Sequence, residues 1–175
     1  MEATEPAGCS EASPGLGSLE ASREEIEMSD VERNIDVFRR LEAAHQARDN
    51  DTIRSLLTDD FTPHTAGSEM MPPGAEGAIA ANEGSFSFMP DKRTEILDLF
   101  GEGDRTVAHV RMQATNTGGA IAWAGFSEPT GKAVDFDWIQ ISRHTDDGRI
   151  AETWSQMDVP KMLMQLGAMP APEGM

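Results

Sequence analysis

The fold is decided by five segments in the second half of the sequence: RTEILDLF (93–100), RTVAHVRMQATN (105–116), IAWAGF (121–126), KAVDFDWIQIS (132–142) and RIAETWSQM (149–157). Each segment contains β-branched or aromatic residues, which favour strands. Three of the connections, at 102–104, 128–131 and 146–148, combine Gly with acidic residues or Pro, as hairpin turns do. We therefore predict five strands in an antiparallel sheet.

The residues before the strands have the periodicity of helices. Four helices are predicted: one from Val31 up to the polar stretch 48–51, a shorter one that contains Ile53, Leu56 and Leu57, and two over 75–88 and 160–166. Asp30 is the predicted N-cap of the first helix, and Gly167 ends the last one. Helices followed by an antiparallel sheet indicate an α+β fold. We expect a strongly bent sheet wrapped around the N-terminal helices, which gives a conical barrel with a pocket.

Residues 1–30 differ from the rest in composition. They carry eight acidic residues and one basic residue, which is −7 of the formal net charge of −17. Such a segment buries too little apolar area to offset the entropy lost on ordering. We predict an acidic, disordered leader over 1–30 and a single domain over 31–175. Cys9 lies in the leader without basic neighbours, so a reactive thiolate is not expected there.

The overall composition excludes several classes of partner. A net charge of −17 repels nucleic acid and anionic membranes, so we expect neither as a partner. No run of apolar residues is long enough to span a bilayer, and the N-terminus has no secretory signal pattern. Cys9 is the sole cysteine, which rules out an internal disulfide and fits a reducing cytoplasm.

Several catalytic chemistries lack their residues. The four histidines have no metal-ligand spacing, so no metal site is expected, and no phosphate-binding glycine loop appears. The chain has no Tyr, which excludes an oxyanion hole built on a buried phenol. Its three lysines, Lys92, Lys132 and Lys161, are predicted at strand edges, turns or an exposed helical turn, where a desolvated Schiff-base lysine is not expected.

A series of short motifs runs in order through residues 90–167: PD (90–91), GEGD (101–104), ATNTG (114–118), PTGK (129–132), Arg143, DGRI (147–150), Glu152, Trp154, Asp158 and QLG (165–167). This order resembles the SnoaL-like polyketide cyclases (ester cyclases) of the nuclear transport factor 2-like superfamily, over about residues 31–168. The resemblance implies a conical α+β barrel with a deep apolar pocket. It also implies cofactor-free ring closure of a polyketide by intramolecular aldol condensation.

The resemblance gives Asp158 the role of acid/base, because the family places a carboxylate near the end of the last strand. The residues alone allow another role. Asp158 directly precedes Val159-Pro160-Lys161, where a carboxylate caps the final helix. Both roles remain open at the level of the sequence. One position departs from the family: Asn116 stands where a histidine is frequent, and an amide binds a carbonyl but transfers no proton near pH 7.

Other residues are candidates for the substrate site. Trp154 and Gln156 share a strand face with Glu152 and Asp158, and this mixture is more typical of a pocket wall than of a dry core. His64, ahead of a Gly/Pro-rich loop, is either a general base at the pocket mouth or a partly exposed histidine.

Three further side chains have two interpretations each. His109 lines a polar pocket or faces solvent. Asp137 is a second pocket carboxylate or belongs to a solvated face, depending on whether the strand contains a bulge near Trp138. Trp123 packs in the core or lines the cavity.

The leading hypothesis is a cofactor-free cyclase that acts on a small, largely apolar carbonyl compound. Asp158 and His64 are its predicted catalytic residues. Trp154, Gln156, Asn116, His109, Trp123 and Asp137 are its predicted substrate-binding residues. The alternatives are an isomerase, dehydratase or epoxide hydrolase that uses the same pocket, and a non-catalytic small-molecule-binding protein. The resemblance also implies a homodimer that forms through an exposed sheet face.

Overall fold

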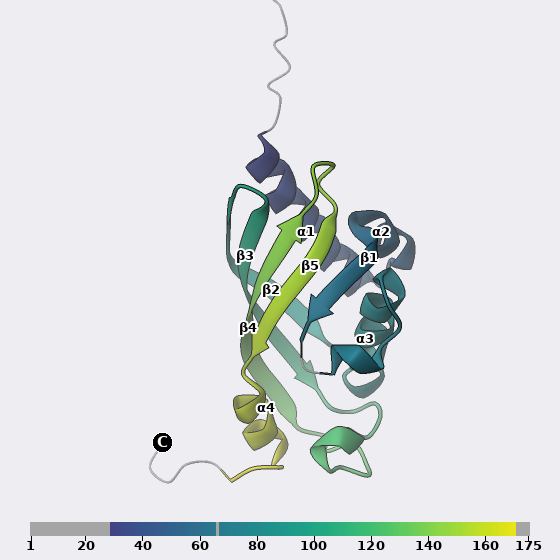
Figure 1. The fold of residues 1–175 in the computed structure, drawn as a ribbon. Coiled ribbons are helices and arrows are strands. Elements are labelled where there is room, and N and C mark those ends of the chain that lie inside the picture. The colour runs from purple at the N-terminus through teal and green to yellow at the C-terminus, as the bar shows by residue number, and fades with distance from the viewer. Residues whose placement is uncertain (1–28, 66, 171–175) are drawn as a thin grey trace, which may run out of the picture.

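The computed structural model describes residues 29–65 and 67–170 (Figure 1). Its elements are, in order, α1 (Asp30–Ala47), α2 (Asn50–Leu56), β1 (Leu57–His64), η1 (Ser68–Met70), α3 (Ala75–Phe88), β2 (Arg93–Glu102), β3 (Arg105–Thr115), η2 (Ala122–Ala124), β4 (Ala133–His144), β5 (Ile150–Met157) and α4 (Val159–Leu166). The predicted leader lies outside the described residues, apart from its last two positions, and so does Cys9. Within the described ranges, none of the helices has the length and apolarity that a membrane crossing requires.

The five strands form one sheet in the order β1-β5-β4-β3-β2. The four strands from β2 to β5 are antiparallel neighbours, whereas β1 pairs with β5 in parallel. The α+β class is confirmed. Two details differ from the prediction: the sheet is mixed, and it is curled but not closed, because β1 and β2 pair with different neighbours and not with each other (Figure 1).

The first helix begins one residue earlier than predicted, because Ser29 and not Asp30 is its N-cap. The Ser29 hydroxyl accepts a hydrogen bond from the backbone N–H of Glu32, and the Glu32 carboxylate accepts one from the backbone N–H of Ser29. This reciprocal capping box satisfies two backbone donors that a carboxylate at position 30 would leave open. Asp30 instead lies in the first turn and pairs with Arg33.

The inner face of the sheet packs against α1. Phe38 of α1 forms one apolar cluster with Ala108 and Val110 of β3. The pairing of β3 with β4 has no register shift, so Val134 and Phe136 share this inner face. Figure 1 shows α1 crossing behind the sheet, on the side away from the viewer.

Since successive side chains alternate between faces, the regular pairing of β3 with β4 also fixes the outer face. Asp135, Asp137, Ile139 and Ile141 point outward together. No bulge occurs near Trp138, and the solvated-face interpretation of the two acids is the one that the structure adopts.

The predicted strand over 121–126 is wrong. These residues form the 3-10 turn η2 within the long connection from β3 to β4. The carbonyl of Ile121 accepts hydrogen bonds from the N–H groups of Ala124 and Phe126, so the backbone closes on itself and does not join the sheet. Gly125 has φ +86°, a left-handed conformation that also ends this turn. Ile121 is buried in the apolar cluster beneath α4, which accounts for its strand-like character in the sequence.

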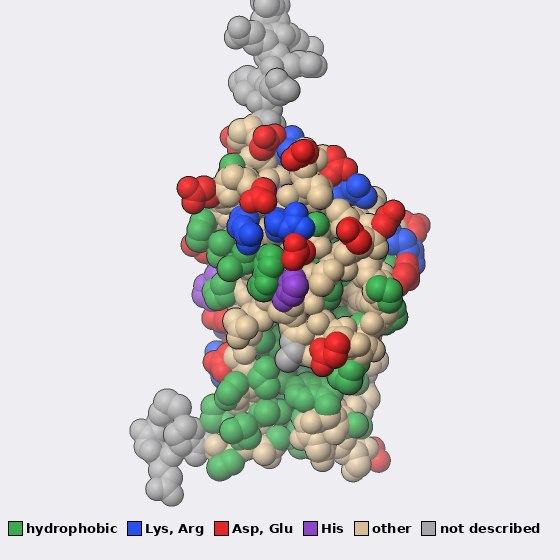
Figure 2. All heavy atoms as spheres, in the orientation of Figure 1, with side chains coloured by type: hydrophobic (Ala, Val, Ile, Leu, Met, Phe, Trp, Pro, Cys, Tyr) green, Lys and Arg blue, Asp and Glu red, His purple; other side chains and the backbone are tan. Residues whose placement is uncertain are grey.

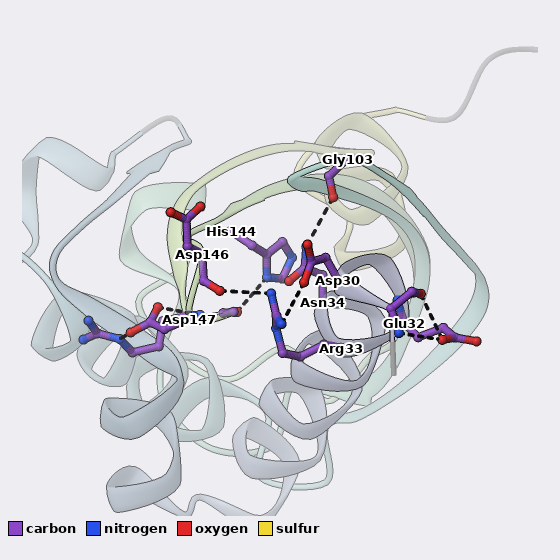
Figure 3. Close-up of polar contacts among 11 residues, drawn as sticks. Asp30, Glu32, Arg33, Asn34, Gly103, His144, Asp146 and Asp147 are labelled. Atoms are coloured by element: carbon purple, nitrogen blue, oxygen red, sulfur yellow. Dashed lines mark hydrogen bonds and ion pairs between the residues drawn. The ribbon is translucent and has the colours of Figure 1, made fainter. Parts of the chain in front are cut away.

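The β4–β5 hairpin is tied to α1 by polar contacts (Figure 3). A guanidinium N–H of Arg33 donates to the carbonyl of Asp146 (3.0 Å). Buried His144 donates from Nδ1 to the carbonyl of Gly148 (2.9 Å), and its Nε2 accepts from the Thr106 hydroxyl (3.0 Å). Burial lowers the pKa of His144, so the neutral ring is the form built into this end of the sheet.

Candidate functional site

The face of β5 that the sequence analysis assigned to the pocket is the outer face of the sheet. Glu152, Trp154 and Gln156 pair with Arg143, Ile141 and Ile139 of β4, all of which point outward. The inner face of β5 carries Thr153, Ser155 and Met157 instead. The alternation of side chains along a strand correctly predicted that Glu152, Trp154 and Gln156 share one face. It did not indicate which side of the sheet that face occupies.

His64 lies on this outer face and is held by the carboxylate of Glu152. Its Nε2 atom is 2.8 Å from Oε2 of Glu152. The other oxygen, Oε1, accepts a hydrogen bond of 2.7 Å from Nε of Arg143. One carboxylate therefore joins a histidine of β1 to an arginine of β4. All three side chains are partly exposed, between 28% and 40%.

The indole of Trp154 fixes the plane of the imidazole. The His64 and Trp154 rings stack with centroids 4.7 Å apart and an interplanar angle of 11°. The Arg105 guanidinium lies 5.3 Å from the centre of the indole. Stacking and hydrogen bonding together restrain both the plane and the in-plane rotation of His64.

Glu152 is ionised near neutral pH. Hydrogen bonds from His64 and from Arg143, in that order of effect, lower the pKa of its carboxyl group. A carboxylate accepts hydrogen bonds and donates none. The His64 nitrogen that faces Glu152 must therefore carry a proton, which leaves Nδ1 as the basic nitrogen of the neutral ring.

An open hollow of about 820 Å³ lies along β1 and the segment that follows it. Residues 60–65 line one side, and residues 68–69 and 71–74 line the other. His64 is part of this lining. Asp60 and Glu69 are the acidic residues of the hollow, and Met71 and Pro72 contribute apolar surface.

Asp158 caps α4, as one of its two predicted roles requires. Its Oδ1 accepts a hydrogen bond of 3.0 Å from the backbone N–H of Lys161. Its own N–H donates to the carbonyl of Asp137 (3.1 Å). Within the described residues, Oδ2 has no hydrogen-bond partner. The carboxyl group is exposed, beside an apolar cluster to which α4 contributes Met162 and Leu166.

Asn116 is fully buried and holds the loop that follows β3. Its Nδ2 donates to the carbonyls of Phe88 and Gly119, both at 3.0 Å, and its Oδ1 accepts from the N–H of Thr130 at 2.7 Å. These three bonds use both donors and one lone pair of the amide. The side chain thus connects the end of α3 to the β3–β4 connection. Trp123, from the same connection, is 63% exposed.

His109 faces outward and pairs with Asp137 across β3 and β4. The distance from Nε2 to Oδ2 is 3.0 Å, and both side chains are about 40% exposed. This pair resembles the pair of His64 and Glu152 in composition. Among the described residues, no arginine is bonded to the second carboxylate oxygen and no indole stacks on the imidazole of this pair. It does not line the hollow beside β1.

A row of polar side chains on the inner face was not identified from the sequence. Gln140 donates to the Ser142 hydroxyl (3.3 Å) and accepts from Ser155 (3.2 Å). Gln140 and Ser155 are half-buried, whereas most of the inner face is apolar. The alternation of β5 contains the signal, because Thr153 and Ser155 occupy the face opposite to Trp154.

Lys92 lies at the edge of a strand as predicted, directly before β2, but it is desolvated, which the sequence analysis did not expect. It is 8% exposed, and its Nζ donates to Oδ1 of Asn82 (2.7 Å). The ammonium also lies 4.2 Å from the centre of the Phe86 ring. Burial lowers the pKa of Lys92 to about 8, although the carboxylates of Glu42 and Glu83 oppose the shift. Lys92 joins α3 to the start of β2.

The described ranges contain no cluster of three or more His, Cys, Asp or Glu side chains arranged to hold a metal ion. The acidic and histidine side chains of the outer face instead form separate pairs, such as His109 with Asp137 and Arg111 with Asp135. Each pair combines opposite charges or a charge and an imidazole.

Comparison with solved structures gives the same fold. TsrD from Streptomyces laurentii is 24% identical with a TM-score of 0.66, over 77% of this chain and 94% of TsrD. IdmH from Streptomyces antibioticus, a proposed polyketide cyclase, is 29% identical with a TM-score of 0.64, over 77% of this chain and 98% of IdmH. An epoxide hydrolase of the LEH-like type from M. tuberculosis is 17% identical with a TM-score of 0.59, over 79% of this chain and 92% of the hydrolase. No curated protein matches the sequence.

These neighbours confirm the nuclear transport factor 2-like α+β fold that the resemblance implied. At the level of sequence, the family model described as SnoaL-like polyketide cyclase matches residues 35–166. The match runs from α1 through α4 and includes His64, Glu152 and Asp158. It covers well over half of the chain, so this protein belongs to the SnoaL-like polyketide cyclase family.

Proposed function

We propose that the protein closes a ring in a small polyketide-like carbonyl compound by an intramolecular aldol reaction. A side chain takes a proton from the carbon next to one carbonyl. The resulting enolate carbon attacks a second carbonyl carbon of the same molecule, so that a C–C bond forms and a C=O π bond breaks. The new alkoxide then takes up a proton. Substrate and product are isomers, so the step balances with proton transfer alone.

The position of Asp158 is the observation that carries this proposal. The carboxylate lies between the last strand and the last helix, where the family resemblance expects the acid/base. One oxygen is occupied by the backbone N–H of Lys161, and the other has no partner in the described part of the chain. A single carboxylate is thus able to cap α4 with Oδ1 and to exchange a proton with substrate through Oδ2.

The surface around this end of the molecule suits an apolar substrate. Met157, Trp123 and Met169 expose between 42% and 63% of their surface. Figure 2 shows hydrophobic side chains gathered over the lower end, where Figure 1 places α4 and the loop with η2. Charged side chains gather instead over the upper half of the same view. In the proposal, the apolar end binds the carbon skeleton of the substrate.

Substitution of Asp158 tests the proposal, because the two roles of its carboxylate separate chemically. Asn caps a helix about as well as Asp but is not a proton-transfer group near neutral pH. We expect Asp158→Asn to keep the fold and to lose about 10²- to 10⁴-fold in kcat on a panel of diketones and aromatic polyketide esters. Wild-type kcat in Asp158→Asn would remove Asp158 as the acid/base.

Epoxide hydrolysis is the second candidate function. Arg111 pairs with Asp135 through two nitrogen–oxygen contacts, and Asp137 contributes to the same electrostatic environment. An arginine held between two acids is the arrangement that an epoxide hydrolase of this superfamily would use. However, the hydrogen bond from Arg111 lowers the pKa of Asp135 to about 2. Asp135 is therefore ionised at neutral pH and has no proton to give to an epoxide oxygen, which favours the cyclase.

We also propose that the protein forms a homodimer through the outer face of β2–β4. Phe100 and Ile139 expose 57% and 44% of their surface on this face, next to half-buried Ile141. Unpaired apolar surface on a sheet face favours association. Light scattering on the full chain is expected to give twice the chain mass of 19.0 kDa, and Phe100→Glu is expected to give a monomer. A wild-type mass equal to one chain would refute the dimer.

A further inference from the structure

The side chain of Glu152 contacts His64, which the sequence analysis predicts to be the second catalytic residue beside Asp158. It lies on β5, its Oε2 is 2.8 Å from Nε2 of His64, and its Oε1 accepts from Arg143. A carboxylate that binds an imidazole through one nitrogen decides which ring nitrogen carries the proton. We propose that Glu152 is a positioning residue that makes Nδ1 of His64 the proton acceptor of the hollow beside β1.

The charges around His64 support this assignment. Hydrogen bonds from His64 and Arg143 lower the pKa of Glu152, so its oxygen accepts a hydrogen bond from Nε2–H and donates none. Nδ1 has no hydrogen-bond partner among the described residues. The neutral ring therefore has one bonded N–H and one free lone pair.

The geometry fixes the direction of the lone pair as well as its existence. Trp154 stacks on the imidazole with an interplanar angle of 11° and prevents the ring from tilting. Arg143, which pairs with Glu152 across β4 and β5, donates a hydrogen bond to its carboxylate and so restrains the orientation of that carboxylate. A base restrained in tautomer, plane and rotation loses little entropy when it meets a substrate proton. The acidic residues of the surrounding hollow are Asp60 and Glu69.

The outer face contains a natural control in His109 and Asp137. Their nitrogen–oxygen distance is 3.0 Å, close to that of His64 and Glu152. No arginine is bonded to the second oxygen of Asp137 in the described structure. His109 does not line the hollow beside β1. A measurement on both histidines separates a local tautomer effect from a general change in the sheet.

The first test is long-range ¹H–¹⁵N NMR on the full chain with labelled histidine, which reports the protonated nitrogen without any substrate. We expect the neutral ring of wild-type His64 to be the Nε2–H tautomer. In Glu152→Gln, Arg143 retains the amide oxygen, which turns the NH₂ group toward His64. Nε2 then becomes an acceptor, and the proton moves to Nδ1.

Asp137→Asn serves as the matched control and is expected to change the His109 signals while leaving those of His64 unchanged. The proposal is overturned if wild-type His64 carries its proton on Nδ1, or if Glu152→Gln leaves its tautomer unchanged. The wild-type spectrum alone is decisive if the variant does not fold.

The second test measures turnover and rests on the proposed function. Glu152→Gln is expected to lower kcat by about 10²-fold with little change in KM, because the proton moves to Nδ1 of His64, so the free lone pair of that base is lost while no binding contact is removed. Glu152→Asp, which keeps a carboxylate, is expected to restore part of the loss. Asp51→Asn, at a side chain that is 98% exposed on α2, provides a control with the same loss of charge. A kcat unchanged in Glu152→Gln contradicts the positioning role.

The two tests also separate this inference from the proposed function. Absence of any ring-closed product from the substrate panel counts against the cyclase, whatever the tautomer of His64. An Nδ1–H tautomer in wild-type protein counts against Glu152 alone, even if the cyclase is active.

Discussion

Nε2 of His64 and Oε2 of Glu152 lie 2.8 Å apart although 88 positions separate them in the sequence. The contact exists because β1 pairs with β5 in parallel, which sets His64 beside Trp154 and Thr62 beside Glu152. The first strand is thus fixed to the last one by a backbone ladder and by a polar side-chain pair at its end. The chemistry of this edge depends on that pairing.

Trp154 is expected to stabilise this edge through its stacked neighbour. Trp154→Ala removes the indole between His64 and Arg105, and we expect it to lower the free energy of unfolding by about 2 kcal/mol. Trp154→Phe, which keeps an aromatic face, is expected to lose less than half of that amount. Urea unfolding followed by circular dichroism measures both. Equal losses in the two variants would show that stacking contributes nothing.

The cap of α4 gives a second stability prediction. Asp158→Ala removes the acceptor for the Lys161 N–H and is expected to cost about 1 kcal/mol, whereas Asp158→Asn is expected to be nearly neutral. Chemical denaturation of the two variants checks the difference. If both variants are as stable as the wild type, the hydrogen bond to Lys161 does not stabilise the helix.

How far the sequence predicts this fold is clearest at particular residues. Asp158 and Gly167 were recognised as the ends of α4, because cap chemistry is local and depends on a few adjacent residues. Four of the five predicted strands in the second half are present for the same reason: alternation and turns are local signals. The segment 121–126 was misassigned because burial of Ile121 gives an apolar pattern in a turn as well as in a strand.

The candidate site was less predictable, because it depends on pairing between distant segments. The sequence placed Glu152, Trp154 and Gln156 on one face, which the structure confirms. It did not reveal that this is the outer face, since a strand looks the same from both sides until its neighbours are known. The contact of His64 with Glu152 requires the parallel pairing of β1, which no local pattern indicates.

His144 predicts a loss of stability in mild acid. Burial lowers its pKa from the ordinary value of 6.5, so the unfolded chain binds a proton at a higher pH than the folded protein does. Its contribution to stability is therefore complete above about pH 6.5 and decreases as the pH falls through the lower, folded-state pKa. We expect the free energy of unfolding to decrease between pH 7 and pH 5.

His144→Asn is the control for this prediction. Asn retains a donor for the Gly148 carbonyl but has no titrating ring, so the variant is expected to have a smaller pH dependence than the wild type. Urea titrations of both proteins across this range provide the comparison. Identical pH profiles would exclude His144 as the source of the acid sensitivity.

Lys92 predicts a change of stability with pH in the alkaline range, with the same sign as that of His144. Burial lowers its pKa from 10.5 to about 8, so between these values the unfolded chain binds more protons than the folded protein. Stability attributable to Lys92 therefore rises as the pH increases from about 8 toward 10.5, by about 3 kcal/mol. The difference in unfolding free energy between wild type and Lys92→Met isolates this effect from other titrating groups. A difference that does not vary with pH would contradict it.

The most direct test of the central claim is the identity of the product. The purified chain of 175 residues is incubated with a polyketide-like ester that carries two suitably spaced carbonyls, and the product is examined by mass spectrometry and NMR. The account predicts a ring-closed isomer with unchanged mass, formed by the wild type and strongly reduced with Asp158→Asn. A ring-opened diol from an epoxide substrate, with no ring closure of any dicarbonyl compound, would contradict it.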